Sequence, residues 1–306
     1  MSANGGSPAK AILYAFLANT GIAISKLAAA LYTGSGSMLA EAIHSMADAG
    51  NQVLLFIGLK GAEKPPTKDH PLGFGKLSYF WSFIVALMLF SIGGLFSVYE
   101  GVHKLHGEAE LNDLWVAMVV LAGAILLEGG SLAGAVKEAN LMRGQQSFRD
   151  WLRHTRNAEI VVVLGEDLAA IVGLVLALGF LILTWYTGNP VYDAIGSICI
   201  GVVLIIVAIF VAIRVQSLLV GKSAEPALEA SIRQAIGEDD SILELLNTIT
   251  QQYGPKVMLA VKVRMVPTLT IEQAVGHINA LEKRIKAQHP AVGWCFVEPD
   301  ITDHDN

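Results

Sequence analysis

Long apolar segments recur along the first two thirds of the chain and predict a bundle of membrane helices. A helix needs about 20 residues to cross the hydrocarbon core of a bilayer. Six segments meet that length, at roughly 11–32, 37–60, 77–100, 112–136, 158–186 and 190–214. The connections within the first and last pairs are short and uncharged, so each pair is expected to form a tight hairpin.

The pattern changes after residue 221, where shorter amphipathic segments begin. Apolar residues recur with helical spacing in 226–236 and 271–287, and alternate with polar ones in 245–251, 256–266 and 292–297. This order of elements predicts a small α+β domain with its helices on one face of a sheet. We therefore expect a six-helix transmembrane domain in residues 1–221 and an α+β domain in residues 222–306.

Composition supports a membrane protein and excludes some other classes. The chain is 53% hydrophobic and 16% charged, whereas soluble domains average about 25% charged residues. The net charge of −6 gives no reason to expect a nucleic-acid partner. Two cysteines form neither a disulfide framework nor a thiolate zinc cluster.

The distribution of Lys and Arg predicts the orientation of the helices. One side of the predicted bundle carries 12 basic residues and the other side one, Lys104. Positive charges favour the cytoplasmic side, so both termini are expected in the cytoplasm. The 12 basic residues are Lys10, Lys60, Lys64, Lys68, Lys76, Lys137, Arg143, Arg149, Arg153, Arg156, Arg214 and Lys222.

A polar stripe lies inside the second apolar segment and is the main candidate for chemistry. Glu41, His44, Asp48 and either Asn51 or Gln52 follow one another at spacings of three and four residues. On a helix this spacing places them on one face. Ionisable residues in a membrane helix are costly and usually serve a functional site.

A second acidic group, Glu166 and Asp167, lies in the fifth segment. If the second and fifth helices pack together, Asp167 could meet His44 and Asp48. Two carboxylates and one imidazole suit Zn²⁺ or a similar ion, with ligand distances of about 2.0–2.2 Å. The simpler alternative is that a membrane histidine only forms a hydrogen bond between helices.

Three further polar residues in the apolar segments have simpler interpretations. Glu128 is a lone acid that could relay protons, form a structural hydrogen bond or belong to a neighbouring site. Lys26 is expected to extend its ammonium group toward the membrane surface. Asp193 is expected to be an acid in the first turn of the sixth helix.

Two motifs resemble the cation diffusion facilitator family. They are the run from Thr33 to Asp48, TGSGSMLAEAIHSMAD, and the run from His70 to Lys76, HPLGFGK. The Glu166-Asp167 pair makes the chain most similar to the zinc-transporter-9-like branch and its bacterial relatives. The resemblance implies a homodimeric secondary transporter, not an enzyme, that exports divalent metal in exchange for protons and has no prosthetic group. It also implies a dimerisation role for the C-terminal domain, and we expect a bacterial inner membrane as the location.

The resemblance places the transported metal on His44, Asp48 and Asp167. Many members of the family have a fourth ligand one turn before the last of these, where this chain has Val163. Valine cannot ligate a metal, so water or another side chain must complete the site. The candidates for an additional ligand or proton relay are Glu166, Glu41, Asn51 and Glu128.

Three alternatives to zinc transport differ in ion or in class. An oxygen-rich site with one histidine also suits Mn²⁺, Fe²⁺, Co²⁺ or Ni²⁺. A membrane scaffold with a vestigial metal site would use the same helices without transport. An intramembrane metalloprotease is disfavoured, because the chain has no His-Glu-x-x-His motif.

Overall fold

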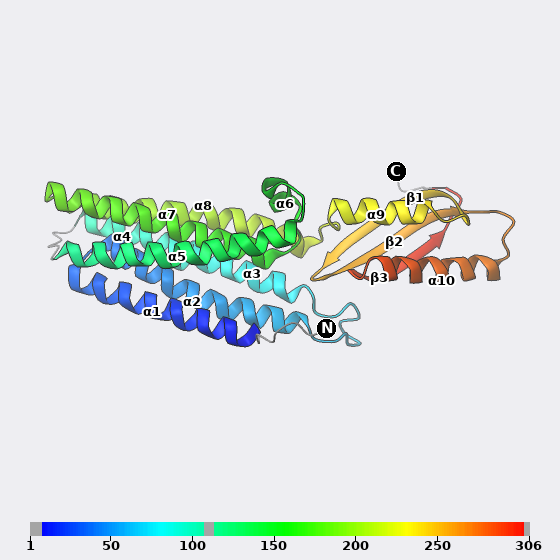
Figure 1. Ribbon diagram of the computed structural model, residues 1–306, viewed down its shortest axis with the longest axis horizontal. Helices are drawn as coiled ribbons and strands as arrows, with labels where there is room; N and C mark the ends of the chain where they lie inside the picture. Colours follow the sequence, from blue (N-terminus) through cyan, green and yellow to red (C-terminus); the bar gives the residue numbers. More distant parts are fainter. Residues whose placement is uncertain (1–7, 107–112, 303–306) are drawn as a thin grey trace. The chain divides into compact units, whose positions relative to one another are not determined.

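The computed structural model describes residues 8–106 and 113–302 (Figure 1). Contacts group these residues into two compact units, a helical unit and a unit that contains the sheet. The elements in chain order are α1 (Pro8–Thr33), α2 (Gly36–Ala62), α3 (Leu77–Met88), η1 (Leu89–Leu95), α4 (Phe96–Leu105), α5 (Leu114–Arg143), α6 (Phe148–His154), α7 (Ala158–Thr187), α8 (Val191–Val220), α9 (Pro226–Gly237), β1 (Ile242–Tyr253), β2 (Lys256–Met265), α10 (Ile271–Gln288) and β3 (Val292–Pro299).

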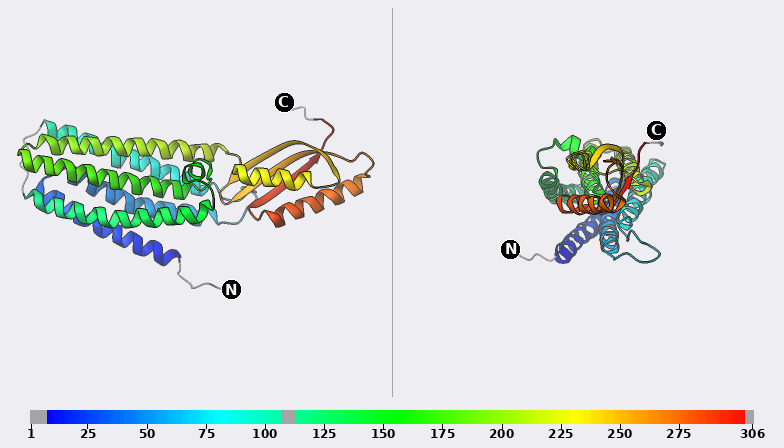
Figure 2. Two further views of the ribbon diagram at one scale, coloured as in Figure 1. Left: turned by 45° about the horizontal axis from the view of Figure 1, so that its top comes forward. Right: turned by 90° about the vertical axis from the view of Figure 1, so that its right-hand side faces the viewer.

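The helical unit is a bundle in which α5 packs along both α1 and α7 (Figures 1 and 2). Among the described residues, four helical stretches are long and apolar enough to cross a membrane: Leu77–Leu105, Leu114–Arg143, Ala158–Thr187 and Val191–Val220. The first two predicted segments also form helices, α1 and α2. The number of six spans stays a prediction.

The third apolar segment contains a feature that the sequence pattern did not predict. Its helix passes through a π-helical stretch, η1, before continuing as α4. Gly94 in this stretch packs against α8 so closely that a Cβ atom there would overlap Ile205. π-Helical turns are rare and are frequent at functional sites, and η1 places Gly93 beside His44 of α2.

The second unit comprises Gly61–Tyr79, Ser147–Asn157 and Gln216–Asn306, of which residues 303–306 lie outside the described part. Its three-stranded sheet has the order β1-β2-β3, with β1 antiparallel and β3 parallel to β2. Helices α9 and α10 pack on one face of the sheet (Figure 2), which confirms the predicted α+β architecture. The division of the chain at residue 221 stays a prediction.

Within this unit, the segment Gly61–Tyr79 contacts the turn of the β1–β2 hairpin. The Tyr79 hydroxyl donates to the carbonyl of Gly254 over 3.1 Å, and the Tyr253 hydroxyl donates to the carbonyl of Gly73 over 3.3 Å. Gly254 has a φ of +63°, and a Cβ there would lie 2.8 Å from the Cα of Gly75. Position 254 therefore requires glycine, both because its φ is positive and because Gly75 leaves no room for a side chain.

Candidate metal site

The predicted polar stripe is buried in the helical unit. The side chains of Glu41, His44 and Asn51 are fully buried, and that of Asp48 is 14% exposed. His44 and Asp48 lie one helical turn apart, with 3.5 Å between His44 Nε2 and Asp48 Oδ2. The spacing of the residues on α2 thus brings an imidazole and a carboxylate together, as the sequence predicted.

Polar atoms without hydrogen-bond partners gather on this stripe. Among the described residues, eight buried side-chain nitrogen or oxygen atoms have no hydrogen-bond partner, and six of them belong to residues 41–52 of α2. Such atoms are rare in folded proteins and usually mark a bound ion, water or functional group. The six are Glu41 Oε1, both ring nitrogens of His44, Asp48 Oδ1, Asn51 Oδ1 and Gln52 Oε1.

The chemistry of these atoms fits a cation. The oxygen atoms are carboxylate or amide oxygens, which offer lone pairs, and a neutral imidazole offers one more. Such donors suit divalent metal ions from Mg²⁺ to Zn²⁺.

The acidic pair on α7 is divided between two neighbouring helices. Glu166 is buried and its Oε1 accepts a hydrogen bond of 2.7 Å from the Asn51 amide on α2. Asp167 is only partly buried and accepts a hydrogen bond of 3.2 Å from Ser131 on α5. The structure therefore brings Glu166 to α2, whereas the sequence suggested Asp167 for this place. Consecutive helical residues point about 100° apart, so the rotation of α7 decides which acid faces α2.

The remaining candidate residues surround this group. Glu128 on α5 is buried, with 8% of its surface exposed. Val163 on α7 is half-buried and supplies no ligand. In the part of the chain that the structure describes, no three His, Cys, Asp or Glu side chains converge closely enough to hold a metal ion. The full ligand set stays a prediction.

Lys26 departs from the sequence expectation. Its side chain does not extend to the membrane surface but is fully buried. Its ammonium group lies 3.2 Å from Glu41 Oε2 and 2.7 Å from Ser45 Oγ, both on α2. A buried lysine is strongly unfavourable unless a carboxylate compensates its charge, which explains why the side chain turns inward to Glu41.

Asp193 also has a larger role than an acid in the first turn of its own helix. It is 1% exposed, and its carboxylate accepts hydrogen bonds from the backbone amides of Gly36 and Ser37 and from the hydroxyls of Ser35 and Ser37. An acid on α8 therefore caps the N-terminus of α2, the helix that carries the candidate site. Sequence reasoning missed this contact because the two segments lie far apart in the chain.

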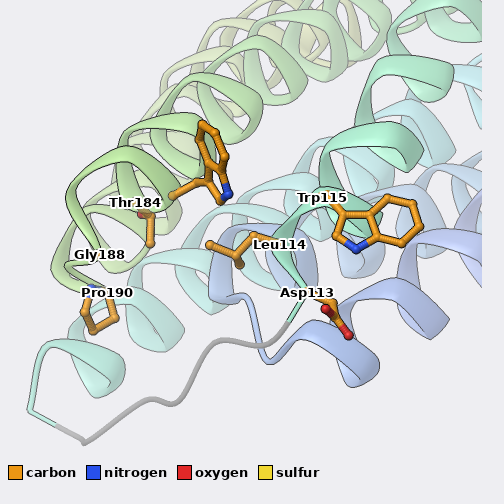
Figure 3. A pocket seen from close by; sticks show the side chains of 7 residues that line it. Asp113, Leu114, Trp115, Thr184, Gly188 and Pro190 are labelled. Atoms are coloured by element: carbon orange, nitrogen blue, oxygen red, sulfur yellow. The ribbon is translucent and has the colours of Figure 1, made fainter.

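A separate pocket of about 370 Å³ lies near the ends of α5 and α7 (Figure 3). It is lined by Asp113, Leu114, Trp115, Thr184, Trp185, Gly188 and Pro190. Thr184 is 18 residues after Glu166 on the same helix, which corresponds to about 27 Å at 1.5 Å per residue. The pocket is therefore distinct from the polar stripe.

Comparison with known proteins identifies the family. Residues 12–220 match the model of the cation efflux transmembrane domain. The chain belongs to the cation diffusion facilitator family. It is 34% identical to the human mitochondrial proton-coupled zinc antiporter SLC30A9 over 237 residues, which are 77% of this chain and 42% of that protein. It is 32% identical to metal tolerance protein C4 of Arabidopsis thaliana over 73% of this chain and 49% of that protein.

The family model and these relatives confirm the resemblance that the two sequence motifs indicated. The chain spans less than half the length of SLC30A9 and about half that of metal tolerance protein C4. The uncharacterized transporter MJ0449 of Methanocaldococcus jannaschii is 22% identical and matches over 98% of its own length. As a cation diffusion facilitator, the protein is an integral multi-pass membrane protein of a transporter family and not an enzyme.

Proposed function

We propose that this protein exports a divalent metal ion from the cytoplasm in exchange for protons, with Zn²⁺ as the favoured cargo. The observation that carries the proposal is the group of six unpartnered buried polar atoms on α2, within a domain that matches the cation efflux family. The relative SLC30A9 is named a proton-coupled zinc antiporter, which supports both the cargo and the counter-ion.

The proposed ligands are His44 and Asp48 of α2 together with a carboxylate from α7. Asp167 is the α7 ligand that the family resemblance implies, and a rotation of α7 would be needed to bring it from Ser131 on α5 to α2. Glu166 is the alternative that already faces α2, through Asn51. Glu41, Asn51 and Glu128 remain candidates for a fourth ligand or a proton relay, because Val163 cannot ligate.

Exchange follows from the competition of metal and protons for the same atoms. A metal ion requires a neutral imidazole and ionised carboxylates, so protonation of these groups displaces it. In the proposed cycle the site faces the cytoplasm to load metal and faces the other side to release it. Helix movements around a fixed site in the middle of the membrane provide the two openings. We place both termini in the cytoplasm and the protein in a bacterial inner membrane.

We further propose that the protein acts as a homodimer through the second unit, which contains the sheet and is called the C-terminal unit below. The face of the sheet opposite α9 and α10 carries a cross-strand row of Ile249, Ala260 and Phe296. Ile249 is 58% and Phe296 55% exposed. An apolar row on an open sheet face supports pairing with a second copy, since contiguous exposed apolar patches, unlike single apolar residues, mark interaction sites.

A harder ion, such as Mn²⁺, Fe²⁺, Co²⁺ or Ni²⁺, is the second candidate cargo. Four of the six unpartnered buried atoms on α2 are oxygens, and the other two are the ring nitrogens of a single histidine, His44. Carboxylate and carbonyl oxygens suit harder ions better than a histidine-rich set does. Competition among these ions in a transport assay separates the two cargoes.

The test is metal transport in vesicles that contain the purified protein and a pH-sensitive dye. Wild-type protein should move Zn²⁺ and protons in opposite directions, and Asp48→Ala and His44→Ala should reduce both fluxes to the level of protein-free vesicles. Asp240→Ala, at an exposed acid of the C-terminal unit, is the matched control and should transport normally. Comparison of Asp167→Ala with Glu166→Ala identifies the α7 ligand. Wild-type flux at background for every metal would refute transport and leave a membrane scaffold.

A further inference from the structure

The buried ion pair between Lys26 and Glu41 lies directly beside the candidate ligands. Glu41 precedes His44 by three residues, and Ser45, the other partner of Lys26, follows it by one. A lysine ammonium group is therefore built into a site that we propose binds a cation.

A positive charge opposes cation binding unless another group compensates it. The 3.2 Å contact with Glu41 Oε2 provides this compensation, so the pair as a whole adds no net charge. Lys26 in turn occupies one oxygen of Glu41. The acids left to face the metal are then those of Asp48, Glu128 and the α7 pair.

The second oxygen of Glu41 is held in a space that α7 provides. Glu41 Oε1 is buried and has no hydrogen-bond partner among the described residues. A Cβ atom at Gly173 would overlap this oxygen, so the carboxylate lies where only a glycine leaves room. Lys26 on α1 and Gly173 on α7 together determine the position of Glu41.

We propose that Lys26 is a positioning residue that keeps Glu41, one of the candidates for a fourth ligand, out of the metal's coordination shell and thereby determines which metal the site prefers. The inference rests on the proposed function. With Lys26 present, Glu41 carries its own counter-ion and the metal meets fewer carboxylates. Without Lys26, Glu41 becomes an uncompensated carboxylate beside His44 and takes the metal as its counter-ion. An additional carboxylate favours harder ions such as Mn²⁺ over Zn²⁺.

The experiment measures dissociation constants for Zn²⁺ and Mn²⁺ by competition with a fluorescent chelator, on purified full-length protein in detergent. Lys26→Met should reduce the preference for Zn²⁺ over Mn²⁺ by about 10-fold or more, the scale typical of changes beside metal ligands. Lys26→Met combined with Glu41→Gln should restore the wild-type preference, and Lys26→Arg should retain it. Lys68→Met, which removes an exposed loop lysine, is the matched control for the loss of one positive charge.

A second comparison keeps the test decisive if Lys26→Met does not fold. Glu41→Gln leaves Lys26 uncompensated and should weaken binding of both ions, and adding Lys26→Met should restore it by about 10-fold. Equal affinities of Glu41→Gln and the double variant, or an unchanged metal preference in Lys26→Met, would overturn the inference. Wild-type protein that binds neither ion would instead refute the proposed function.

Discussion

Replacement of Asp193 by alanine tests how α2 is held in the bundle. The substitution removes a buried carboxylate that accepts hydrogen bonds from two backbone amides in the first turn of α2 and from two serine hydroxyls. The hydroxyls of Ser35 and Ser37 lie 3.1 Å apart and can bond to each other after the change. The amides of Gly36 and Ser37 belong to the helix N-terminus and have no partner within α2.

The expected loss follows from these two amides. Each buried N–H group left without an acceptor costs about 1–3 kcal/mol. The favourable interaction of a carboxylate with a helix N-terminus contributes about 0.3–1 kcal/mol more. Because such contributions are not additive, we expect Asp193→Ala to lower the free energy of unfolding by about 2–4 kcal/mol.

The assay is unfolding of the purified protein in mixed micelles by titration with sodium dodecyl sulfate. Asp193→Asn keeps one oxygen acceptor and should lose about half as much stability. Ser37→Ala removes one hydroxyl donor and should lose about 1 kcal/mol. A loss below about 0.5 kcal/mol in Asp193→Ala, the range of ordinary surface substitutions, would show that the carboxylate does not hold α2.

Two further predictions concern the C-terminal unit. Gly254→Ala strains a turn with positive φ and places a methyl group against the backbone of Gly75 in the segment Gly61–Tyr79. Trypsin should therefore cleave that segment after Lys68 or Lys76 several-fold faster. Gly276→Ala, where nothing lies nearby, should not change the rate. Burial alone would raise the pKa of Asp239, but hydrogen bonds from Ser241 and Arg284 outweigh it and lower that pKa. Asp239 therefore stabilises the fold above about pH 4, its unfolded pKa, and this contribution disappears as the pH falls through the lower folded pKa. Asp239→Asn should remove the contribution, so the variant should show a smaller difference in melting temperature between pH 7 and pH 3 than the wild type. An unchanged difference would contradict the assignment.

The C-terminal unit was predictable from the sequence because its signals are local. Alternation of apolar and polar residues identifies strands, and the Tyr253-Gly254-Pro255 turn identifies the hairpin. The structure confirms the order of elements, with β1 extending over Ile242–Tyr253 and β2 over Lys256–Met265. The docking of the Gly61–Tyr79 segment onto this hairpin could not be predicted, since it depends on contacts between distant parts of the chain.

The helical unit was predictable as a set of helices but not in its internal contacts. Spacing alone placed His44 and Asp48 on one face of α2, because 3.6 residues per turn fixes their relation. It could not decide between Glu166 and Asp167, since the rotation of α7 depends on packing. The sequence also predicted the wrong environment for Lys26, because its side chain is long enough to reach either the membrane surface or the buried Glu41. The π-helical turn at Leu89–Leu95 has no simple pattern of residues that would predict it.

The unpartnered atoms on α2 have a consequence for coupling. An exchanger becomes uncoupled if it passes between its inward-facing and outward-facing states with neither metal nor protons bound. In that condition each of the six atoms that remains dry and unpaired costs about 1–3 kcal/mol. A metal ion removes this cost for the atoms that ligate it, by accepting their lone pairs, and protons reduce it by turning carboxylates into donors. In the proposed cycle, the same burial that makes α2 a receptor for cations therefore also opposes the futile return of an unloaded carrier.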